Sequence, residues 1–127
     1  MIEFLKNKSN SIALVGASKN PDKYGNKILK DLISKGYRVF PINKSEKEIE
    51  GLEVFKNVTD LKEIPSIINF VVPPNESRTV TNYLVSKGYD NFWYQPGAES
   101  QDISSYLKSL NKNFIDDKCI IINEIFI

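Results

Sequence analysis

Short apolar runs alternate with longer amphipathic stretches along this chain. The apolar runs have the length of buried strands and cover residues 11–15, 37–42, 66–72, 91–94 and 113–117. Between them, apolar side chains recur at helical spacing in residues 25–35, 75–87 and 101–111. This alternation predicts an α/β fold: a doubly wound, mostly parallel, five-stranded Rossmann-like sheet with helices on both faces.

The same pattern predicts finer features of the helices. Gly36 and Gly88 directly follow two of the helices and are expected to end them in the left-handed conformation. Asn75 follows two prolines, and its side chain is expected to cap the second helix. The side chains expected to face the core from the first two helices are Ile28, Leu29, Leu32, Ile33, Val80, Tyr83 and Leu84.

The remaining segments have weaker patterns. Residues 45–56 are polar, with a turn at Gly51 and a short extended piece at residues 52–55. Residues 59–63 have the length of one helical turn. The apolar stretch 119–127 is expected either to add a strand to the sheet or to pair two copies of the chain.

Composition limits the classes of protein that fit. The length of 127 residues predicts a single domain, residues 1–127. The 17 basic residues nearly balance the 16 acidic ones, so the charge gives no reason to expect a nucleic-acid or membrane partner. No apolar run approaches the ~20 residues of a membrane span, and the charged first eight residues do not resemble a secretory signal. We therefore expect a cytoplasmic protein.

The chain contains no histidine, which excludes a Ser-His-Asp triad, a Cys-His pair and an imidazole metal site. We accordingly expect no metal and no catalytic residue. Cys119 is the one cysteine and has two interpretations. Its thiol either forms a mixed disulfide with a thiol ligand, or it packs as a small apolar side chain.

The segment from residue 12 to residue 26 carries the strongest functional signal. A strand runs into the small residues Gly16, Ala17 and Ser18, and a helix follows. Free N–H groups at the start of a helix, together with the helix dipole, favour a bound anion. In a parallel sheet, the loops at residues 16–24, 43–45, 73–75 and 95–98 would meet at one edge. The sequence therefore predicts a phosphorylated ligand at this edge, near the first strand.

The identity of the phosphorylated ligand is narrowed by what the turn and the second strand lack. The dinucleotide fingerprint G-x-G-x-x-G is missing, because Ser18 stands at the second glycine position. The second strand ends in Asn43 and Lys44 instead of the acid that holds an NAD ribose. A lysine there suits a ribose phosphate, as in NADP or coenzyme A. There is also no P-loop motif for ATP or GTP.

Six segments, in order along nearly the whole chain, resemble a known family. They are residues 15–21 (Val-Gly-Ala-Ser-Lys-Asn-Pro), 36–43 (Gly-Tyr-Arg-Val-Phe-Pro-Ile-Asn), 49–51 (Ile-Glu-Gly), 72–74 (Val-Pro-Pro), 93–98 (Trp-Tyr-Gln-Pro-Gly-Ala) and 119–120 (Cys-Ile). Together they resemble the small stand-alone CoA-binding proteins, which are similar to the N-terminal CoA-binding domain of the succinyl-CoA synthetase alpha subunit.

The resemblance implies a role for each loop of the predicted edge. The turn after the first strand would hold the pyrophosphate of coenzyme A, and the segment after the second strand would lie near the ribose and its phosphate. The loop after the third strand would line the adenine side, and the loop after the fourth would face the pantetheine end. The residues implied to bind the cofactor are Gly16, Ala17, Ser18, Lys23, Tyr24, Gly25, Asn43, Lys44, Val72, Pro73, Pro74, Gln95 and Gly97.

Three functional hypotheses follow. The first is a protein that binds coenzyme A or an acyl-CoA without catalysis of its own. The second is an NADP-dependent oxidoreductase domain. The third is the CoA-binding subunit of a split acyl-CoA ligase that acts with a separate chain. The larger synthetases carry a phosphorylated histidine in a second domain, and this sequence has neither, so the resemblance extends to binding and not to ligase activity. A homodimer is the other partner considered.

Overall fold

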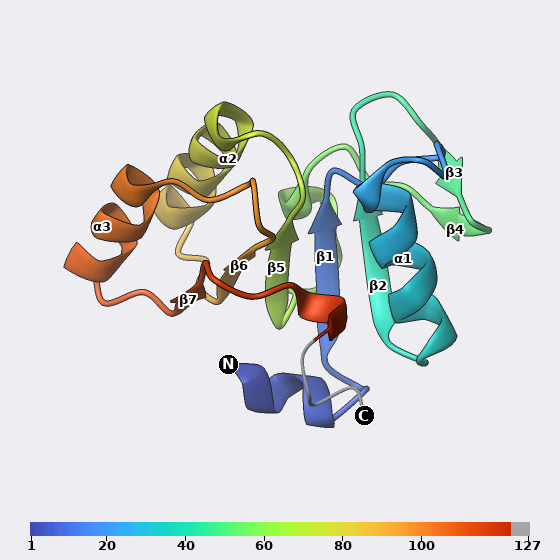
Figure 1. The fold of residues 1–127 in the computed structure, drawn as a ribbon, viewed down its shortest axis with the longest axis horizontal. Helices are drawn as coiled ribbons and strands as arrows, with labels where there is room; N and C mark the ends of the chain where they lie inside the picture. Colours follow the sequence, from blue (N-terminus) through green and yellow to red (C-terminus); the bar gives the residue numbers. More distant parts are fainter. Residues whose placement is uncertain (123–127) are drawn as a thin grey trace.

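Five parallel strands form the central sheet of the computed structural model, which describes residues 1–122 (Figure 1). The strands are β1 (Ser11–Val15), β2 (Arg38–Ile42), β5 (Ile67–Phe70), β6 (Phe92–Tyr94) and β7 (Phe114–Ile115), in the order β2-β1-β5-β6-β7. The chain first adds β2 on one side of β1 and then β5 to β7 on the other. This confirms the predicted doubly wound sheet, with its switch point between β1 and β5.

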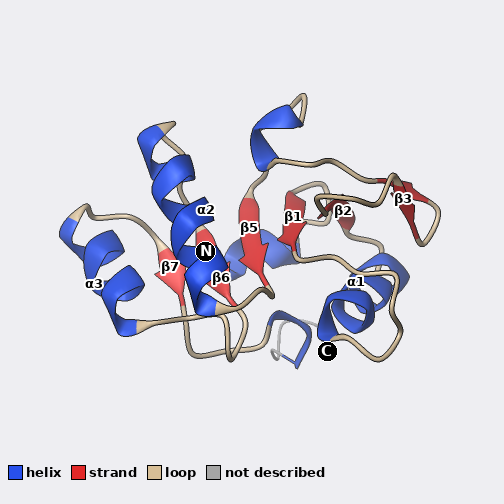
Figure 2. Ribbon diagram, turned by 90° about the horizontal axis from the view of Figure 1, so that it is seen from above, coloured by secondary structure: helices blue, strands red, loops and turns tan. Residues whose placement is uncertain are grey.

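Helices cover both faces of the sheet (Figure 2). Helix α1 (Tyr24–Ser34) lies on one face, and α2 (Pro74–Ser86) and α3 (Gln101–Ser109) lie on the other. All residues of β1 are buried, as expected for a central strand covered on both sides. Because side chains alternate along a strand, Leu14 packs with α1 while Val15 packs in the core beneath α2 and α3.

The polar segment after β2 forms a small hairpin. Its strands are β3 (Glu48–Ile49) and β4 (Leu52–Glu53), joined by the expected turn at Gly51. Beyond it, Phe55 bridges Ile42 at the edge of the main sheet, so the expected extended piece is confirmed. The short 3₁₀ helix η2 (Val58–Asp60) supplies the expected helical turn slightly earlier than predicted.

Both ends of the described chain pack on the α1 face. Helix η1 (Ile2–Lys6) was not predicted; its Leu5 is buried, and the Tyr37 hydroxyl donates a hydrogen bond to the Leu5 carbonyl at 2.5 Å. Instead of a strand, the start of the apolar segment forms the 3₁₀ helix η3 (Ile120–Ile122), with Ile120 buried. Residues 123–127, on which the prediction of an extra strand or a paired chain also rested, lie outside the described residues.

Helix α2 departs from the prediction at its start and on its inward face. It begins at Pro74 with Pro73 as N-cap, and Asn75 does not cap it. Proline suits this position because the first N–H groups of a helix need no partner within it. Tyr83 is 48% exposed, whereas Thr81 is buried and its hydroxyl lies 2.6 Å from that of Tyr94. The inward face thus holds a satisfied polar pair, which hydrophobic spacing does not reveal.

The other helix predictions are confirmed apart from one side chain. Ile28, Leu29, Leu32 and Leu84 are buried, while Ile33 is 36% exposed at the margin of its face. Gly36 and Gly88, both with φ of +85°, follow the ends of α1 and α2 in the left-handed conformation.

Candidate functional site

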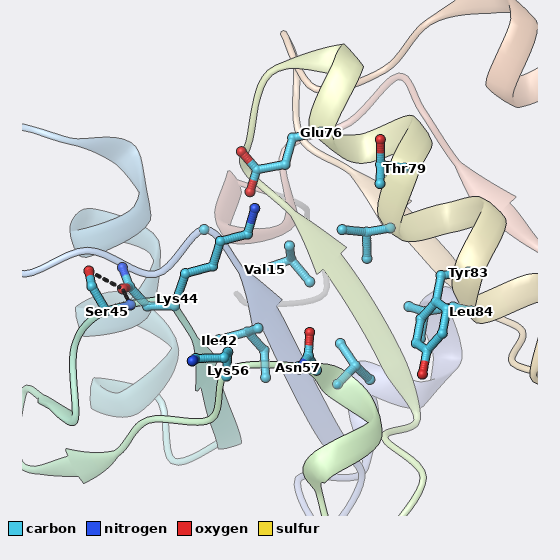
Figure 3. Close-up of a pocket in the computed structure, with 14 residues that line it drawn as sticks. Val15, Ile42, Lys44, Ser45, Lys56, Asn57, Glu76, Thr79, Tyr83 and Leu84 are labelled. Carbon is cyan, nitrogen blue, oxygen red and sulfur yellow. Dashed lines mark hydrogen bonds between the residues drawn. The ribbon is translucent and has the colours of Figure 1, made fainter.

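Two adjoining cavities open at the carboxyl ends of β1, β2 and β5. The first, which we call the apolar cavity, has a volume of about 480 Å³ and lies between η2, the ends of β1 and β2, and α2 (Figure 3). The second, the turn cavity, has a volume of about 680 Å³ and lies between the turn after β1, the start of α1 and the loops after β5 and β6. Gly16, Asn43 and Glu76 line both, so the two cavities adjoin one another at these residues.

Successive backbone carbonyls of the turn after β1 face the protein. The Gly16 oxygen lies against the Cα of Gly25, since a Cβ there would be 2.1 Å from it. The Ala17 oxygen accepts a hydrogen bond from Asn43 Nδ2 at 2.9 Å, and the Ser18 oxygen accepts one from Asn26 Nδ2 at 2.9 Å. These contacts fix the orientation of each peptide plane in the turn.

In a trans peptide, each carbonyl points opposite to the N–H that follows it. The N–H groups of Ala17, Ser18 and Lys19 therefore face away from the groups that hold the carbonyls. None of these three N–H groups has a hydrogen-bond partner within residues 1–122. We call them the anion cradle, because free backbone N–H groups in the turn between a strand and a helix bind phosphate oxygens.

Two glycines allow this geometry. Gly16 has φ of +104°, and a Cβ on it would be 2.7 Å from Val72 Cγ1. Gly25 lets the first turn of α1 press against the Gly16 carbonyl. Within residues 1–122, no side chain caps α1 at its N-cap, Lys23, so the positive end of this helix lies at the turn cavity without a side-chain acceptor from these residues.

The apolar cavity has both apolar and charged side chains in its lining. Val15, Ile42, Val58, Val80 and Leu84 form apolar walls of the first cavity. Lys44 and Lys56 also line it, and Figure 3 shows Lys44 extending across the cavity toward Glu76. Over the part of the chain that the structure describes, neither lysine forms an ion pair. Both cations are therefore available to an anionic ligand.

A hydroxyl also lies in the turn cavity. It is that of Ser18, whose Oγ accepts a hydrogen bond from the Asn20 N–H at 3.1 Å. Its own proton is then left to donate, so the hydroxyl complements the three N–H groups beside it. Lys19, in contrast, pairs with Glu46 at 3.0 Å.

The structure brings together the residues that the sequence resemblance implied, with one exception. The turn cavity is lined by Gly16, Ala17, Ser18, Lys23, Tyr24, Gly25, Asn43, Val72, Pro73, Pro74 and Gly97, and Lys44 lines the apolar cavity. Gln95 lines neither and is buried.

Gln95 instead fastens the segment that follows β7. Its Oε1 accepts from the Ile120 N–H at 2.9 Å and from Asn69 Nδ2 at 3.1 Å, and its Nε2 lies 2.9 Å from Cys119 Sγ. The reason is the alternation of β6: Tyr94 points toward α2, so Gln95 points to the α1 face, below the edge loops. Cys119 is partly buried in this same network.

Several cavity residues were missed by sequence reasoning. They are Lys56, Asn57, Glu76, Thr79 and Tyr83 in the apolar cavity. Lys56 and Asn57 precede a short 3₁₀ turn and carry no motif. Tyr83 follows the apolar spacing of α2 and was assigned to the core, but its half-exposed ring lies at the cavity instead.

A family model described as a CoA binding domain matches residues 10–124 of the chain. The chain belongs to the CoA binding domain family. This confirms the resemblance found in the sequence. Within residues 1–122 of this CoA binding domain, no helix is both long enough and apolar enough to cross a membrane.

Relatives of this CoA binding domain include small proteins and parts of ligases. It is 29% identical to the uncharacterized protein YneT of Bacillus subtilis, over 94% of this chain and 88% of that protein. A conserved hypothetical protein from Pyrococcus furiosus has a similar structure, with a TM-score of 0.85 and 46% identity, over 89% of this chain and 97% of that one. The small relatives are thus matched over most of their length.

The alpha subunit of ADP-forming acetate–CoA ligase II from Pyrococcus furiosus is 33% identical to this CoA binding domain over 78 residues. The match covers 61% of this chain and 16% of that subunit. This domain is thus related to a minor part of the ligase subunit.

Proposed function

We propose that this chain binds coenzyme A or an acyl-CoA across the two cavities and does not transform it. The observation that carries the proposal is the anion cradle, which adjoins an apolar cavity bordered by two unpaired lysines. A suitable nucleotide would place a diphosphate at the anion cradle, an aromatic base in the apolar cavity and a ribose phosphate beside the lysines. Membership of the CoA binding domain family supports coenzyme A as that nucleotide.

In the proposed arrangement, the diphosphate receives hydrogen bonds from the anion cradle and the Ser18 hydroxyl. The adenosine extends past Asn43 and Glu76 into the apolar cavity, and Lys44 lies near the ribose phosphate. The loop at residues 72–74, which the resemblance assigned to the adenine side, lines the turn cavity and would instead lie beside the diphosphate. The pantetheine arm leaves along the opposite wall of the turn cavity, past Gly97. Gln95 is not included among the ligand contacts, because its side chain is buried below the loop.

The absence of catalysis is part of the proposal. The chain has no histidine, so the phosphohistidine chemistry of the larger synthetases has no residue to act on. The Cys119 thiol lies beside Gln95 and on the wall of neither cavity. These observations support a binding role.

A second candidate is the CoA-binding part of a split acyl-CoA ligase. The similarity to the ligase alpha subunit favours it. In that case, a separate chain would supply the catalytic residues, and coenzyme A would bind in the same cavities. Affinity purification from the native source, with the ligase subunits identified by mass spectrometry, distinguishes the two candidates.

Calorimetric titration of the reduced protein tests the proposal, with coenzyme A, dephospho-CoA, NADPH and NAD as ligands. We expect selective binding of coenzyme A, with dephospho-CoA weaker by about tenfold because it lacks the phosphate assigned to Lys44. Lys44→Ala should remove this preference, whereas Lys108→Ala, an exposed lysine of α3, is the control for the loss of one positive charge. Binding of NADPH but not coenzyme A would overturn the proposal.

A further inference from the structure

We propose that Asn26 and Glu50 form a positioning pair that sets the peptide between Ser18 and Lys19 in the anion cradle. This inference rests on the proposed function. Asn26 lies in the first turn of α1 and is 1% exposed. Its Nδ2 donates to the Ser18 carbonyl at 2.9 Å and to Glu50 Oε2 at 3.1 Å. One side-chain amide therefore connects the phosphate-facing turn to the hairpin β3–β4.

The orientation of the Asn26 amide follows from its neighbours. The Ser18 carbonyl and the Glu50 carboxylate are both acceptors, so the opposite orientation would place Oδ1 against two oxygens. In the orientation present, Oδ1 is buried and has no hydrogen-bond partner among the described residues. The fold thus leaves a buried oxygen unsatisfied in order to keep both hydrogens of Nδ2 on these acceptors.

The position of Glu50 is itself unusual. It lies in the left-handed region with φ of +51° and precedes Gly51 with φ of +78°. Together they form the two-residue turn between Ile49 and Leu52. Such turns favour Asn-Gly, because asparagine tolerates the left-handed conformation better than glutamate does. The shorter asparagine side chain would not span the distance that the glutamate carboxylate covers to reach Asn26.

The consequence for the ligand follows from peptide geometry. Holding the Ser18 carbonyl toward Asn26 turns the Lys19 N–H the opposite way, into the cradle. Asn43 does the same for the Ser18 N–H through the Ala17 carbonyl. The hairpin contributes no residue to either cavity, yet through Glu50 it holds one of the three donors in place.

The decisive variant is Glu50→Asn, because it separates positioning from stability. It places Asn-Gly in the turn, and this gain offsets the loss of the Asn26–Glu50 hydrogen bond, so the melting temperature should stay close to that of the native protein. At the same time it removes the acceptor for Asn26, and the dissociation constant for coenzyme A should increase by about threefold to tenfold. Glu50→Gln keeps an acceptor oxygen at the same reach and should bind coenzyme A nearly as well as the native chain.

Asn26→Ala is the second variant, and Asn69→Ala is its matched control. Asn69 is also a buried asparagine with an unsatisfied Oδ1, but it donates to Trp93 O and Gln95. Both variants should lower the melting temperature, and only Asn26→Ala should weaken coenzyme A. Adenosine 3′-monophosphate, which lacks the diphosphate, should bind all variants within about twofold of the native chain, because it does not reach the cradle.

Equal affinity of Glu50→Asn and native protein for coenzyme A would overturn the inference, as would parallel losses for both ligands. NMR of the ligand-free protein keeps it testable if coenzyme A does not bind at all. Glu50→Asn should then shift or broaden the backbone amide signals of residues 18–20, and Asn69→Ala should not. Failure of coenzyme A binding with these shifts present would refute the proposed function alone; unchanged signals would refute the positioning pair.

Discussion

Substituting Gly25 by alanine tests the close contact between α1 and the turn after β1, because this contact reverses the sign of the expected change in stability. At an ordinary helical position, Gly→Ala stabilises a protein by about 1 kcal/mol because alanine has the higher helix propensity. Here the added Cβ would be 2.1 Å from the Gly16 oxygen, and real Cβ contacts are essentially never shorter than 3.0 Å. The turn and α1 must therefore separate by about 0.9 Å. We expect Gly25→Ala to destabilise the fold instead.

The same displacement should weaken ligand binding. A hydrogen bond to a charged group contributes about 1.5–3 kcal/mol, and a shift of this size misaligns more than one N–H of the anion cradle. A loss of about 3 kcal/mol corresponds to an increase of about 150-fold in the dissociation constant for coenzyme A. Calorimetry gives the affinity, and thermal unfolding gives the stability of the same sample.

The control for Gly25→Ala is Gly88→Ala, just past the C-terminal end of α2. Gly88 has φ of +85°, and no atom of the described residues lies within 4 Å of its hypothetical Cβ. Alanine there should cost about 1 kcal/mol through backbone strain, or about 4 °C in melting temperature, with affinity unchanged. A Gly25→Ala protein that is more stable than the native one and binds coenzyme A normally would refute the close contact between α1 and the turn.

Two further predictions concern the α2 face. Tyr94→Phe leaves the buried Thr81 hydroxyl without its partner and should cost about 1–3 kcal/mol in urea unfolding, while the Tyr94→Phe/Thr81→Val double variant should recover part of this loss. Strict additivity of the two single variants would contradict the pairing. Hydrogen bonds from Arg78 and then Ser100 hold the pKa of Asp102 below its usual range. A depressed carboxyl pKa stabilises the folded state above the unfolded value of about 4, and the contribution is lost as the pH falls toward the folded pKa. The melting temperatures of native protein and Asp102→Asn should therefore differ at pH 7, and the difference should shrink progressively as the pH falls below about 4; a gap that is constant with pH would exclude this ionic origin.

The sequence predicted the sheet because burial of parallel strands leaves a direct mark on composition. The run from Ser11 to Val15 is buried throughout, and the structure places it inside the sheet, between β2 and β5. The inward face of α2 was mispredicted for the opposite reason. Thr81 is polar and buried, and its compatibility with the core depends on Tyr94, a partner that lies on a different element. Helical spacing contains no information about such a pair.

The residues of the candidate site likewise fall into those that local sequence identifies and those that depend on contacts with other elements. Gly16 and Lys44 could be selected from local sequence, because a turn after a strand and a cation at a strand end have recognisable spacing. Gln95 was placed in the site because its loop reaches the edge. Which face its side chain takes depends on the alternation of β6, which the short strand does not fix in the sequence. Asn26 was missed because it acts on the backbone of the turn and lines no cavity.

Some of the proposed ligand contacts come from the backbone and others from side chains, and this difference decides which residues select the nucleotide. The cradle donors are main-chain N–H groups, so they require glycine at positions 16 and 25 and the amides that hold the turn, and most other substitutions in the turn leave the donors in place. Such a cradle binds a phosphate without distinguishing the nucleotide that carries it. Discrimination must then come from the rim of the apolar cavity, where Lys44 and Lys56 are side chains that can be exchanged without disturbing the fold. Variation at these two lysines should therefore change the preferred nucleotide, while variation at Gly25 should weaken the binding of every nucleotide that places a phosphate in the cradle.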